Sequence, residues 1–494
     1  MSALIPTPEQ QAALNAFASG GTLVIEAGAG TGKTSTLRML GAVRPRKSGL
    51  YVAYTKRVQI EAARSFPTNV EARTAHSLAF AAFGAPMRGR LHGPRITTRE
   101  AAKVLRARPV RLDQDVTIAD STIAAMALQT VTNFCHSADR AISVRHFAPP
   151  IAPLERDTTQ LADIVVRLAR RAWDDLTAPS GRLRPFHDVY LKLWQLSSPK
   201  LPFDFILFDE AQDADPAIAD VVTHQDAQLV AVGDGAQAIF GWRGATDFLD
   251  RVEAEHRVQL TQSWRFGEAI AAKANTWLSV LHARLRLEGS PHRTSIIGPI
   301  GVPDAILCRT NAGCVAEVMR AHTQRLPVAL VGDGADMVAL ADAAKQFRAG
   351  QPCCHRELVA FSNWEEVQHY VEHDPGGSDL AVGVKLIDRY GPDAIIEALR
   401  SCVPEREAAL AVSTAHKAKG REWGQVRVSD DFYEPKPDPA TSDPGPIPRA
   451  EAMLAYVAVT RAMTRLDTGS LAWVHRHPVT TRIKPDPAPH TGWT

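Results

Sequence analysis

The chain has 494 residues, and at roughly 100 to 200 residues per domain this length predicts several domains. With 45% hydrophobic and 22% charged residues and a formal net charge of +2, it is neither a disordered chain nor one that binds nucleic acid through overall charge. No stretch approaches about 18 uninterrupted apolar residues, and the N-terminus lacks a basic segment followed by an apolar run. We therefore expect a soluble, unexported protein without a membrane partner.

The six cysteines show no C-x-x-C spacing and are few for a chain of this length. This usage indicates a reducing compartment, so we expect a cytoplasmic location. Cys353, Cys354 and His355 are adjacent, but no second pair of ligands stands nearby at a usable spacing. The sequence therefore does not predict a zinc site.

The first chemical motif is a glycine-rich loop at residues 22–34, TLVIEAGAGTGKT, between an apolar strand and a helix that starts near Lys33. Glycines let successive backbone N–H groups turn toward a polyphosphate, and the helix N-terminus adds partial positive charge. Lys33 would reach the β and γ phosphates and Thr34 would bind Mg²⁺. The generic pattern opens with Gly where this chain has Ala27, and a glycine-rich turn without a ligand is the alternative. The predicted phosphate-binding residues are Ala27, Gly28, Ala29, Gly30, Thr31, Gly32, Lys33, Thr34 and Ser35.

Alternating strands and helices extend over about 20–80 and again over 203–262, with helical patterns such as 120–134 and 159–176 between them. This order predicts one α/β domain interrupted by a helical insertion. Basic residues at 84–100 could attract nucleic-acid phosphates, although a solvated arginine-rich loop explains them equally well.

The second chemical motif is FDFILFDEAQD at 203–213, an apolar strand that ends in two acids. Asp209 would hold Mg²⁺ through its hydration shell, and Glu210 would orient and deprotonate the attacking water. The alternative is that both acids only cap the next helix. Together with the glycine-rich loop, this motif predicts hydrolysis of a nucleoside triphosphate without indicating what the hydrolysis drives.

A third segment, GDGAQAIFGWRGA at 233–245, carries large aromatic residues on a glycine-rich loop, where they are hard to bury. Beyond it, a second α/β region has predicted strands around 304–309, 327–332, 409–414 and 425–430. We expect its closing helix to be EAMLAYVAVTRAMTRL, residues 451–466, with Arg461 inside that helix.

These motifs are similar to those of superfamily 1A helicases of the UvrD/Rep type, in the same order along nearly the whole chain. The matching blocks are 7–14, the glycine-rich loop, 51–57, 73–77, 208–213, 233–245, 262–266, 413–423 and 456–462. Within that family, residues 307–312, 331–347 and 416–423 with 429–432 most resemble the helicase part of F-box DNA helicases. The first family motif begins almost at residue 4, so we expect no F-box ahead of it.

The resemblance implies an α/β fold with two RecA-like parallel-sheet motor domains of the P-loop NTPase class. It implies a helical 1B insertion, and a 2B subdomain that is reduced or absent because few residues remain for it. The expected boundaries are 1–84 and 201–262 for domain 1A, 85–200 for 1B, 263–348 and 409–475 for domain 2A, 349–408 for the small helical insertion, and 476–494 for the tail.

The resemblance also implies roles around ATP and Mg²⁺, the expected cofactors. Gln10 would read the adenine edge, and Gln237 would bind the γ phosphate or its water. Arg265 and Arg461 would contact the γ phosphate from the second domain, as planar cations suited to phosphate. Glu422 would touch the ribose, with an ordinary surface glutamate as the alternative.

For DNA, the resemblance implies contacts from both domains. Trp242 and Phe240 would stack on bases, which favours binding without sequence preference. A core anchor is the alternative for Trp242, and a buried structural role is the alternative for His76. Lys56 stands where the family usually has asparagine. The predicted DNA-binding residues are Tyr54, Thr55, Lys56, His76, Ser77, Phe240, Trp242, Arg243, His416 and Lys417.

The function that this resemblance implies is an ATP-dependent helicase or translocase that moves 3′ to 5′ on single-stranded DNA, in DNA repair, recombination or replication. Its expected partner is single-stranded DNA or DNA with a 3′ single-stranded tail, and we expect a monomer. Two alternatives stay open: a nucleotide-controlled DNA-binding switch without sustained translocation, and an RNA-directed motor.

Overall fold

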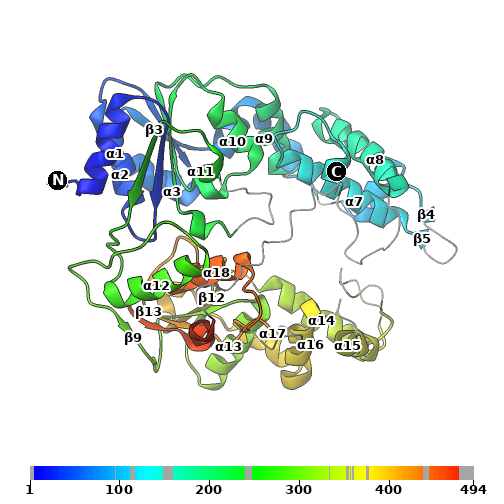
Figure 1. Cartoon of the computed structure of the whole chain (residues 1–494). Coiled ribbons are helices and arrows are strands. Elements are labelled where there is room, and N and C mark those ends of the chain that lie inside the picture. The colour runs from blue at the N-terminus through cyan, green and yellow to red at the C-terminus, as the bar shows by residue number, and fades with distance from the viewer. Residues whose placement is uncertain are drawn as a thin grey trace. The chain divides into compact units, whose positions relative to one another are not determined.

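The apolar runs of the sequence assemble into two parallel sheets, one in each of two units of the chain (Figure 1). The computed structural model describes residues 5–94, 96–111, 117–147, 159–239, 248–332, 334–351, 355, 358, 361–373, 378–437 and 444–477. Among these, 5–28 and 32–260 belong to the first unit, and 29–31 and 261–477 belong to the second. The prediction of two parallel α/β domains is confirmed.

The first sheet has the strand order β3-β2-β6-β7-β1-β8, with every neighbouring pair parallel. Alternate residues face two different cores, as with Leu23 and Val24, so both faces are apolar. Its strands are β1 (Leu23–Ala27), β2 (Gly49–Ala53), β3 (Val70–Thr74), β6 (Phe205–Phe208), β7 (Gln228–Gly233) and β8 (His256–Leu260). Helices α1 (Pro8–Ser19), α2 (Lys33–Val43) and α3 (Lys56–Ser65) cover one face, and α4 (Ala75–Ala79), α10 (Pro216–Thr223) and α11 (Phe248–Arg251) pack on the other.

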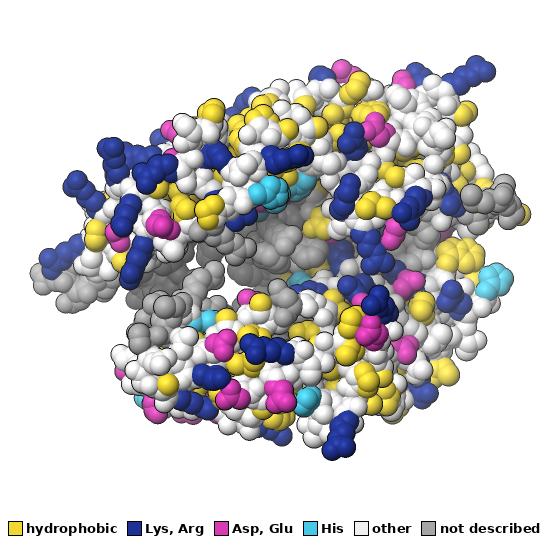
Figure 2. All heavy atoms as spheres, turned by 180° about the vertical axis from the view of Figure 1, so that it is seen from behind, with side chains coloured by type: hydrophobic (Ala, Val, Ile, Leu, Met, Phe, Trp, Pro, Cys, Tyr) yellow, Lys and Arg dark blue, Asp and Glu magenta, His cyan; other side chains and the backbone are white. Residues whose placement is uncertain are grey.

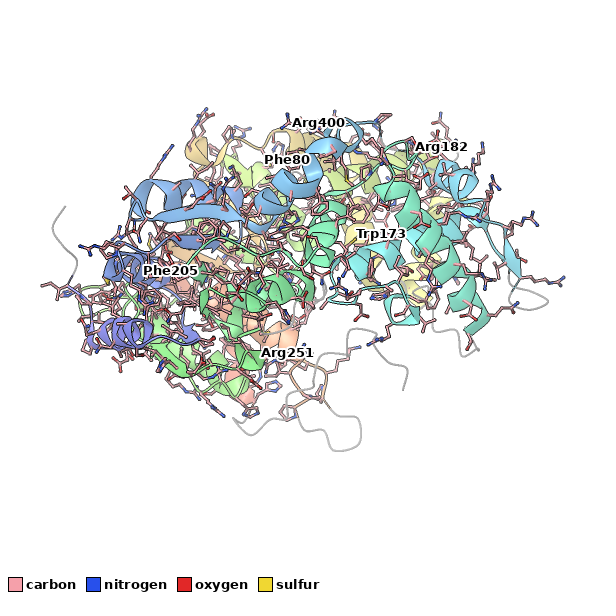
Figure 3. The ribbon with its side chains drawn as sticks, turned by 90° about the horizontal axis from the view of Figure 1, so that it is seen from above. Phe80, Trp173, Arg182, Phe205, Arg251 and Arg400 are labelled. Carbon is pink, nitrogen blue, oxygen red and sulfur yellow. The ribbon has the colours of Figure 1, made fainter. Side chains whose placement is uncertain are left out.

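The helical segment between β3 and β6 shares the core of the second face of this sheet. Its elements are α5 (Arg88–Leu91), α6 (Thr98–Leu105), the strand pair β4 (Val110–Arg111) and β5 (Thr117–Ile118), α7 (Asp120–Cys135), α8 (Thr159–Thr177) and α9 (His187–Leu196). Helices α7 and α8 pack along each other (Figure 1). Figure 3 shows Trp173 on α8 and Phe205 in the sheet; the Trp173 ring lies edge-on to Phe134, with centroids 5.3 Å apart. One continuous core therefore joins this segment to the sheet.

The second sheet has the order β11-β12-β10-β13-β14-β9, again parallel throughout. Its strands are β9 (Ile296–Ile297), β10 (Ala305–Cys308), β11 (Val328–Leu330), β12 (Leu410–Thr414), β13 (Trp423–Val428) and β14 (Ala462–Asp467). The four predicted strands of this region are present. The edge strand β9 and its neighbour β14 were not predicted.

Seven helices accompany the second sheet in the described part of the chain: α12 (Glu268–Val280), α13 (Asn311–Thr323), α14 (Ala335–Arg348), α15 (Trp364–His373), α16 (Ser378–Tyr390), α17 (Pro392–Arg400) and α18 (Arg449–Val459). Helices α14 to α17 gather at one end of this unit (Figure 1). Trp364, Ile387 and Ile395 of α15 to α17 share a core with β10 and β12. Within the described ranges, no helix of the chain is long and apolar enough to cross a membrane.

The prediction of one closing helix over 451–466 is wrong. Helix α18 ends at Val459, and Thr460 closes it by donating its hydroxyl to the carbonyls of Tyr456 and Val457. Arg461 follows the helix, and β14 begins at Ala462. Ala462 and Leu466 are the buried residues of this strand, and their spacing of four residues fits a helix as well as a strand.

Arg90, in the basic segment 84–100, is a structural residue rather than a free surface charge. Its guanidinium donates to the carbonyls of Leu176 and Asp175 (3.1 Å each), Ala178 (2.5 Å) and Leu183 (2.6 Å), at the end of α8. The last carbonyls of a helix have no partners within the helix, and a cation there also suits the helix dipole.

We predict that Arg90→Ala destabilises the first unit by about 2 kcal/mol, because it leaves these carbonyls without a charged donor. Arg99→Ala, an exposed residue of α6, serves as the control and should leave stability unchanged. Thermal unfolding followed by circular dichroism measures both. Equal midpoints for the two variants would contradict the structural role of Arg90.

Candidate active site and nucleic-acid interface

The predicted nucleotide-binding residues of the first unit follow three neighbouring strands. The glycine-rich loop follows β1, the two acids follow β6, and Gln237 follows β7. Strand β7 pairs with both β1 and β6 in parallel. Because the carboxyl ends of parallel strands lie at one edge of a sheet, the sheet brings these three segments together.

The glycine-rich loop has the backbone that a phosphate cradle requires. Gly30 and Gly32 have φ angles of 74° and 84°, a region that residues with a Cβ rarely adopt. Gly32 is the N-cap of α2, and Lys33 is the first residue of that helix, with its Nζ 3.4 Å from the carbonyl of Ala27. Thr34 lies exposed in the same first turn. The helix N-terminus and the lysine suit a polyphosphate.

Gln10 is buried and fixed to the helix that follows the loop. Its Oε1 accepts from the backbone N–H of Thr7 (3.0 Å), and its Nε2 donates to the hydroxyl of Thr36 on α2 (3.1 Å). Beyond these bonds, Oε1 of Gln10 keeps one lone pair and Nε2 keeps one hydrogen. The adenine contact of Gln10 stays a prediction, and Thr36 is a partner that the sequence did not reveal.

Asp209 is buried at the end of β6, and both of its oxygens accept hydrogen bonds. Oδ2 accepts from the Tyr51 hydroxyl of β2 (2.5 Å), and Oδ1 accepts from the backbone N–H of Glu210 (2.9 Å). Burial, followed by the charge of Glu210, raises the pKa of Asp209, while the charge of Lys33 opposes the shift. The carboxylate of Asp209 and the hydroxyl of Thr34 are the oxygen ligands that Mg²⁺ prefers, so these residues fit a Mg²⁺ nucleotide. Tyr51 was not predicted, because it reads as one more residue of an apolar strand.

Glu210 has a φ of 51° and makes no side-chain cap for the short helical turn that follows, Ala211–Asp213. The next helix, α10, is capped by Asp215, whose Oδ1 accepts from the N–H of Ile218 (2.8 Å). The alternative that Asp209 and Glu210 serve only as helix caps is therefore wrong.

Gln212 links Glu210, the predicted general base, to the next strand. This fully buried side chain donates from Nε2 to Glu210 Oε2 (2.5 Å) and accepts at Oε1 from the backbone N–H of Asp234 (3.1 Å). A Cβ added at Gly233 would lie 2.0 Å from Gln212 Oε1, so glycine is required there. The sequence contained this residue in the FDEAQD block, but no pattern indicated what its amide contacts.

Gln237 belongs to the same buried polar group. Its Nε2 donates to Asp234 Oδ2 (2.5 Å), and Asp234 also accepts from the N–H of Ala236 (3.1 Å). The loop after β7 is thus joined through Asp234 and Gln212 to Glu210. Phe240, Trp242 and Arg243, which were predicted to contact DNA, lie outside the described residues.

The predicted strand-binding residues of the first unit follow β2 and β3, which pair in parallel up to Ala53 and Thr74. The Tyr54 side chain is 40% exposed. Thr55 caps α3 by accepting from the N–H of Val58 (3.3 Å), and Lys56 Nζ donates to Gln59 Oε1 (2.6 Å). Tyr54, Thr55 and Lys56 are all exposed, and their contacts to DNA stay predictions.

His76 and Ser77 begin α4, directly after β3. Ser77 forms a reciprocal cap with Thr74. His76 Nε2 lies 3.1 Å from Asp188 Oδ1, yet its side chain is 42% exposed. The histidine therefore combines features of both alternatives: it has a structural partner and a surface open to a ligand.

In the second unit, the three residues predicted to approach ATP gather at the amino edge of the sheet. Arg265 Nε donates to Glu422 Oε2 (2.7 Å), and Arg265 Nη1 donates to the carbonyl of Thr460 (3.1 Å). Arg461 is buried and donates to the carbonyl of Val457 (3.0 Å) and to the Thr460 hydroxyl (3.0 Å). Glu422 and Arg461 directly precede the neighbouring strands β13 and β14. The Glu422 side chain is 51% exposed beside Arg265, and its contact with the ribose stays a prediction.

His416 and Lys417 lie at the opposite, carboxyl edge of the second sheet, directly after β12. Lys417 is exposed. Burial and then the charge of Arg309 lower the pKa of His416. Arg309 follows β10 and forms a two-point ion pair with Glu451. The predicted DNA contacts and the predicted ATP contacts of this unit therefore occupy opposite edges of one sheet.

A buried carboxylate that the sequence did not single out anchors this carboxyl edge. Asp431 accepts from the N–H groups of Arg309 (2.7 Å) and Thr310 (2.8 Å), and from the hydroxyls of Thr310 (2.9 Å) and Ser429 (3.0 Å). It joins the segment after β13 to the segment after β10.

Comparison with known proteins agrees with this geometry. The family described as "AAA domain" matches residues 10–243, a range that contains the glycine-rich loop, both acids and Gln237. F-box DNA helicase protein 1 of Schizosaccharomyces pombe is 29% identical over 489 residues, covering 90% of this chain and 55% of the relative. F-box DNA helicase 1 of Gallus gallus is 30% identical over 501 residues, covering 92% of this chain and 48% of the relative.

The chain is a homologue of the F-box DNA helicases. It spans about half the length of the curated relatives it matches. A solved complex of the Arterivirus nonstructural protein 10 helicase with DNA resembles this helicase homologue at a TM-score of 0.32 and 11% identity, covering 93% of this chain and 63% of that chain.

For this helicase homologue, we predict that Glu210→Gln retains ATP binding but lowers turnover by about 100-fold or more, because the amide cannot take a proton from water. A fluorescent ATP analogue measures binding, and phosphate release measures turnover. Turnover near the wild-type rate would contradict the role of Glu210 as general base.

We also predict that Gln212→Ala lowers turnover by about tenfold while ATP affinity is kept, because Glu210 and the Asp234 N–H lose their shared partner. Gln225→Ala is the matched control. It removes a half-buried glutamine of the same unit whose amide binds backbone groups only, and it should not change turnover. If the two variants lose turnover equally, Gln212 has no specific effect on the acid.

Proposed function

We propose that this chain is an ATP-driven motor that moves 3′ to 5′ along single-stranded DNA and separates strands or displaces bound protein. One observation carries the proposal: a single edge of the first sheet holds both the nucleotide-binding segments and the segments after β2 and β3. The Tyr51–Asp209 hydrogen bond joins the two sets. The names of the two relatives support DNA as the substrate, and the resemblance to UvrD/Rep-type helicases supports the direction.

In the proposed reaction, Lys33 binds the β and γ phosphates, and Thr34 and Asp209 would hold Mg²⁺. Glu210 takes a proton from the attacking water, and Gln212 keeps its carboxylate in place. When bound, Mg²⁺ would neutralise part of the phosphate charge. Arg265 and Arg461 contribute guanidinium groups to the γ phosphate, and Gln237 contacts it or its water.

The strand-binding side combines stacking and charge. The exposed Tyr54 ring suits base stacking, and Lys417 offers an exposed cation in the second unit. Figure 2 shows Lys and Arg side chains spread over the face that it draws. Besides Arg90, which is bonded to the end of α8, residues 88–111 of the helical insertion contain one acid, Glu100, against seven basic residues: Arg88, Arg95, Arg99, Lys103, Arg106, Arg108 and Arg111. Such a local excess attracts phosphates even though the whole chain is nearly neutral.

We further propose a monomer that acts in the cytoplasm in DNA repair, recombination or replication. The free thiols of Cys135, Cys308, Cys314 and Cys402 support a reducing compartment.

The test measures ATPase activity with poly(dT), duplex DNA and poly(U) at one fixed salt concentration, followed by unwinding of duplexes with a 3′ or a 5′ single-stranded tail. We expect poly(dT) to stimulate turnover most and the 3′-tailed duplex to be unwound.

Each other outcome points to a specific alternative. Stimulation by poly(U) alone would make the chain an RNA motor. Binding of poly(dT) with turnover that is insensitive to strand length would indicate a nucleotide-controlled switch. Unwinding of the 5′-tailed duplex alone would reverse the proposed direction.

A further inference from the structure

Asp188, on α9 of the helical insertion, lies between two histidines from other elements. Its Oδ1 is 3.1 Å from Nε2 of His76 at the start of α4, and its Oδ2 is 3.3 Å from Nε2 of His136 at the end of α7. Among the described residues, no group of three His, Cys, Asp or Glu side chains could hold a metal ion. The arrangement is therefore a hydrogen-bonded cluster with one carboxylate at its centre.

Helix α9 is a rigid support for this carboxylate. Lys192, one turn after Asp188, is buried and donates to the carbonyls of Ser137 (2.7 Å) and Asp139 (2.6 Å) just beyond α7. Gln195 donates to Asp220 Oδ2 of α10 (2.7 Å). Val189 and Leu191 belong to the core that also contains residues of β2 and β6. Asp188 is thus held relative to the sheet from which His76 follows.

The imidazole of His76 is oriented from two sides. Asp188 binds its Nε2, and the ring of Tyr190 meets it edge-on, with centroids 6.1 Å apart and an interplanar angle of 88°. The side chain nevertheless remains 42% exposed. A ring fixed at Nε2 has Nδ1 left for a ligand, and in the protonated ring Nδ1–H is a donor suited to a phosphate oxygen.

The carboxylate of Asp188 stays charged in this position. Burial opposes its ionisation, but the hydrogen bonds from His136 and His76 outweigh burial and hold the pKa of Asp188 below its usual range. Asp188 is therefore an ionised acceptor, the kind of partner that fixes which ring nitrogen of a histidine points outward.

We propose that Asp188 is a positioning residue for His76: it holds the imidazole through Nε2 so that Nδ1–H of the protonated ring donates to the phosphodiester backbone of a bound single strand. The inference rests on the proposed function, since it deepens how the chain grips its strand. With Asp188 in this role, DNA binding by the segment after β3 depends on the helical insertion. His76 and Asp188 are 112 residues apart in the sequence.

The test is a double-mutant cycle on the dissociation constant for fluorescently labelled poly(dT). Asp188→Ala and His76→Ala should each weaken binding by about tenfold, the effect of losing one charge-assisted hydrogen bond. The double variant should bind no more weakly than His76→Ala alone, because both changes remove the same contact. A purely structural role of Asp188 would instead give effects that add.

His136→Gln is the matched control. It removes the other partner of Asp188 and leaves the His76 contact, so the dissociation constant should stay within about twofold of wild type. If thermal melting shows that Asp188→Ala does not fold, Asp188→Leu replaces it in the cycle, because leucine also removes the acceptor but fills the space of the carboxylate.

The outcomes separate the two levels of inference. If wild type binds poly(dT) and Asp188→Ala binds equally well, or if the cycle is additive, the positioning role is wrong and the proposed motor function stands. If poly(dT) neither binds to wild type nor stimulates its ATPase, the proposed function itself fails.

Discussion

The parallel arrangement of strands is the constraint on which the rest of this molecule depends. The carboxyl ends of parallel strands lie at one edge of a sheet. Every segment that follows a strand of the first sheet therefore starts at this edge, which we call the rim. The order β3-β2-β6-β7-β1 then divides that rim into a predicted nucleotide-binding part after β1, β7 and β6 and a predicted strand-binding part after β2 and β3. The boundary lies between β6 and β2, where Tyr51 donates to Asp209. Asp209 is therefore bonded directly to the strand that leads to Tyr54.

Hydrogen bonding of buried polar groups explains why the rim has defined geometry. An unpaired buried amide or carboxylate costs about 1 to 3 kcal/mol, so a buried polar group persists only where partners satisfy it. Gln212 meets this condition by bonding Glu210 and the Asp234 backbone, and Asp431 meets it with four donors in the second unit. In both cases one side chain joins segments that follow two neighbouring strands. Loops that would otherwise be independent are held as one surface.

Sequence reasoning predicted the features that depend on local order. These features are the glycine-rich loop, the acids after β6 and the core strands of both sheets. Each is a continuous segment whose residue types indicate its structural surroundings. It did not predict Asp188, Tyr51 or Asp431, because their partners are distant in the sequence and each residue looks ordinary in its own segment. The error at 451–466 has a related cause: the apolar residues on both sides of Thr460 fit one helical period, and only pairing with β13 identifies β14.

The packing of the helical insertion decides whether it can move independently of the first sheet. An insertion with its own core could move as a separate domain, since contacts across such a boundary are few. Here the core of α7, α8 and α9 continues into Val52 of β2 and Phe208 of β6. Asp188 and Gln195 add polar links from α9 to α4 and α10. Displacing α9 would break apolar packing and buried hydrogen bonds together, so the insertion and the first sheet respond as one body to a ligand at the rim.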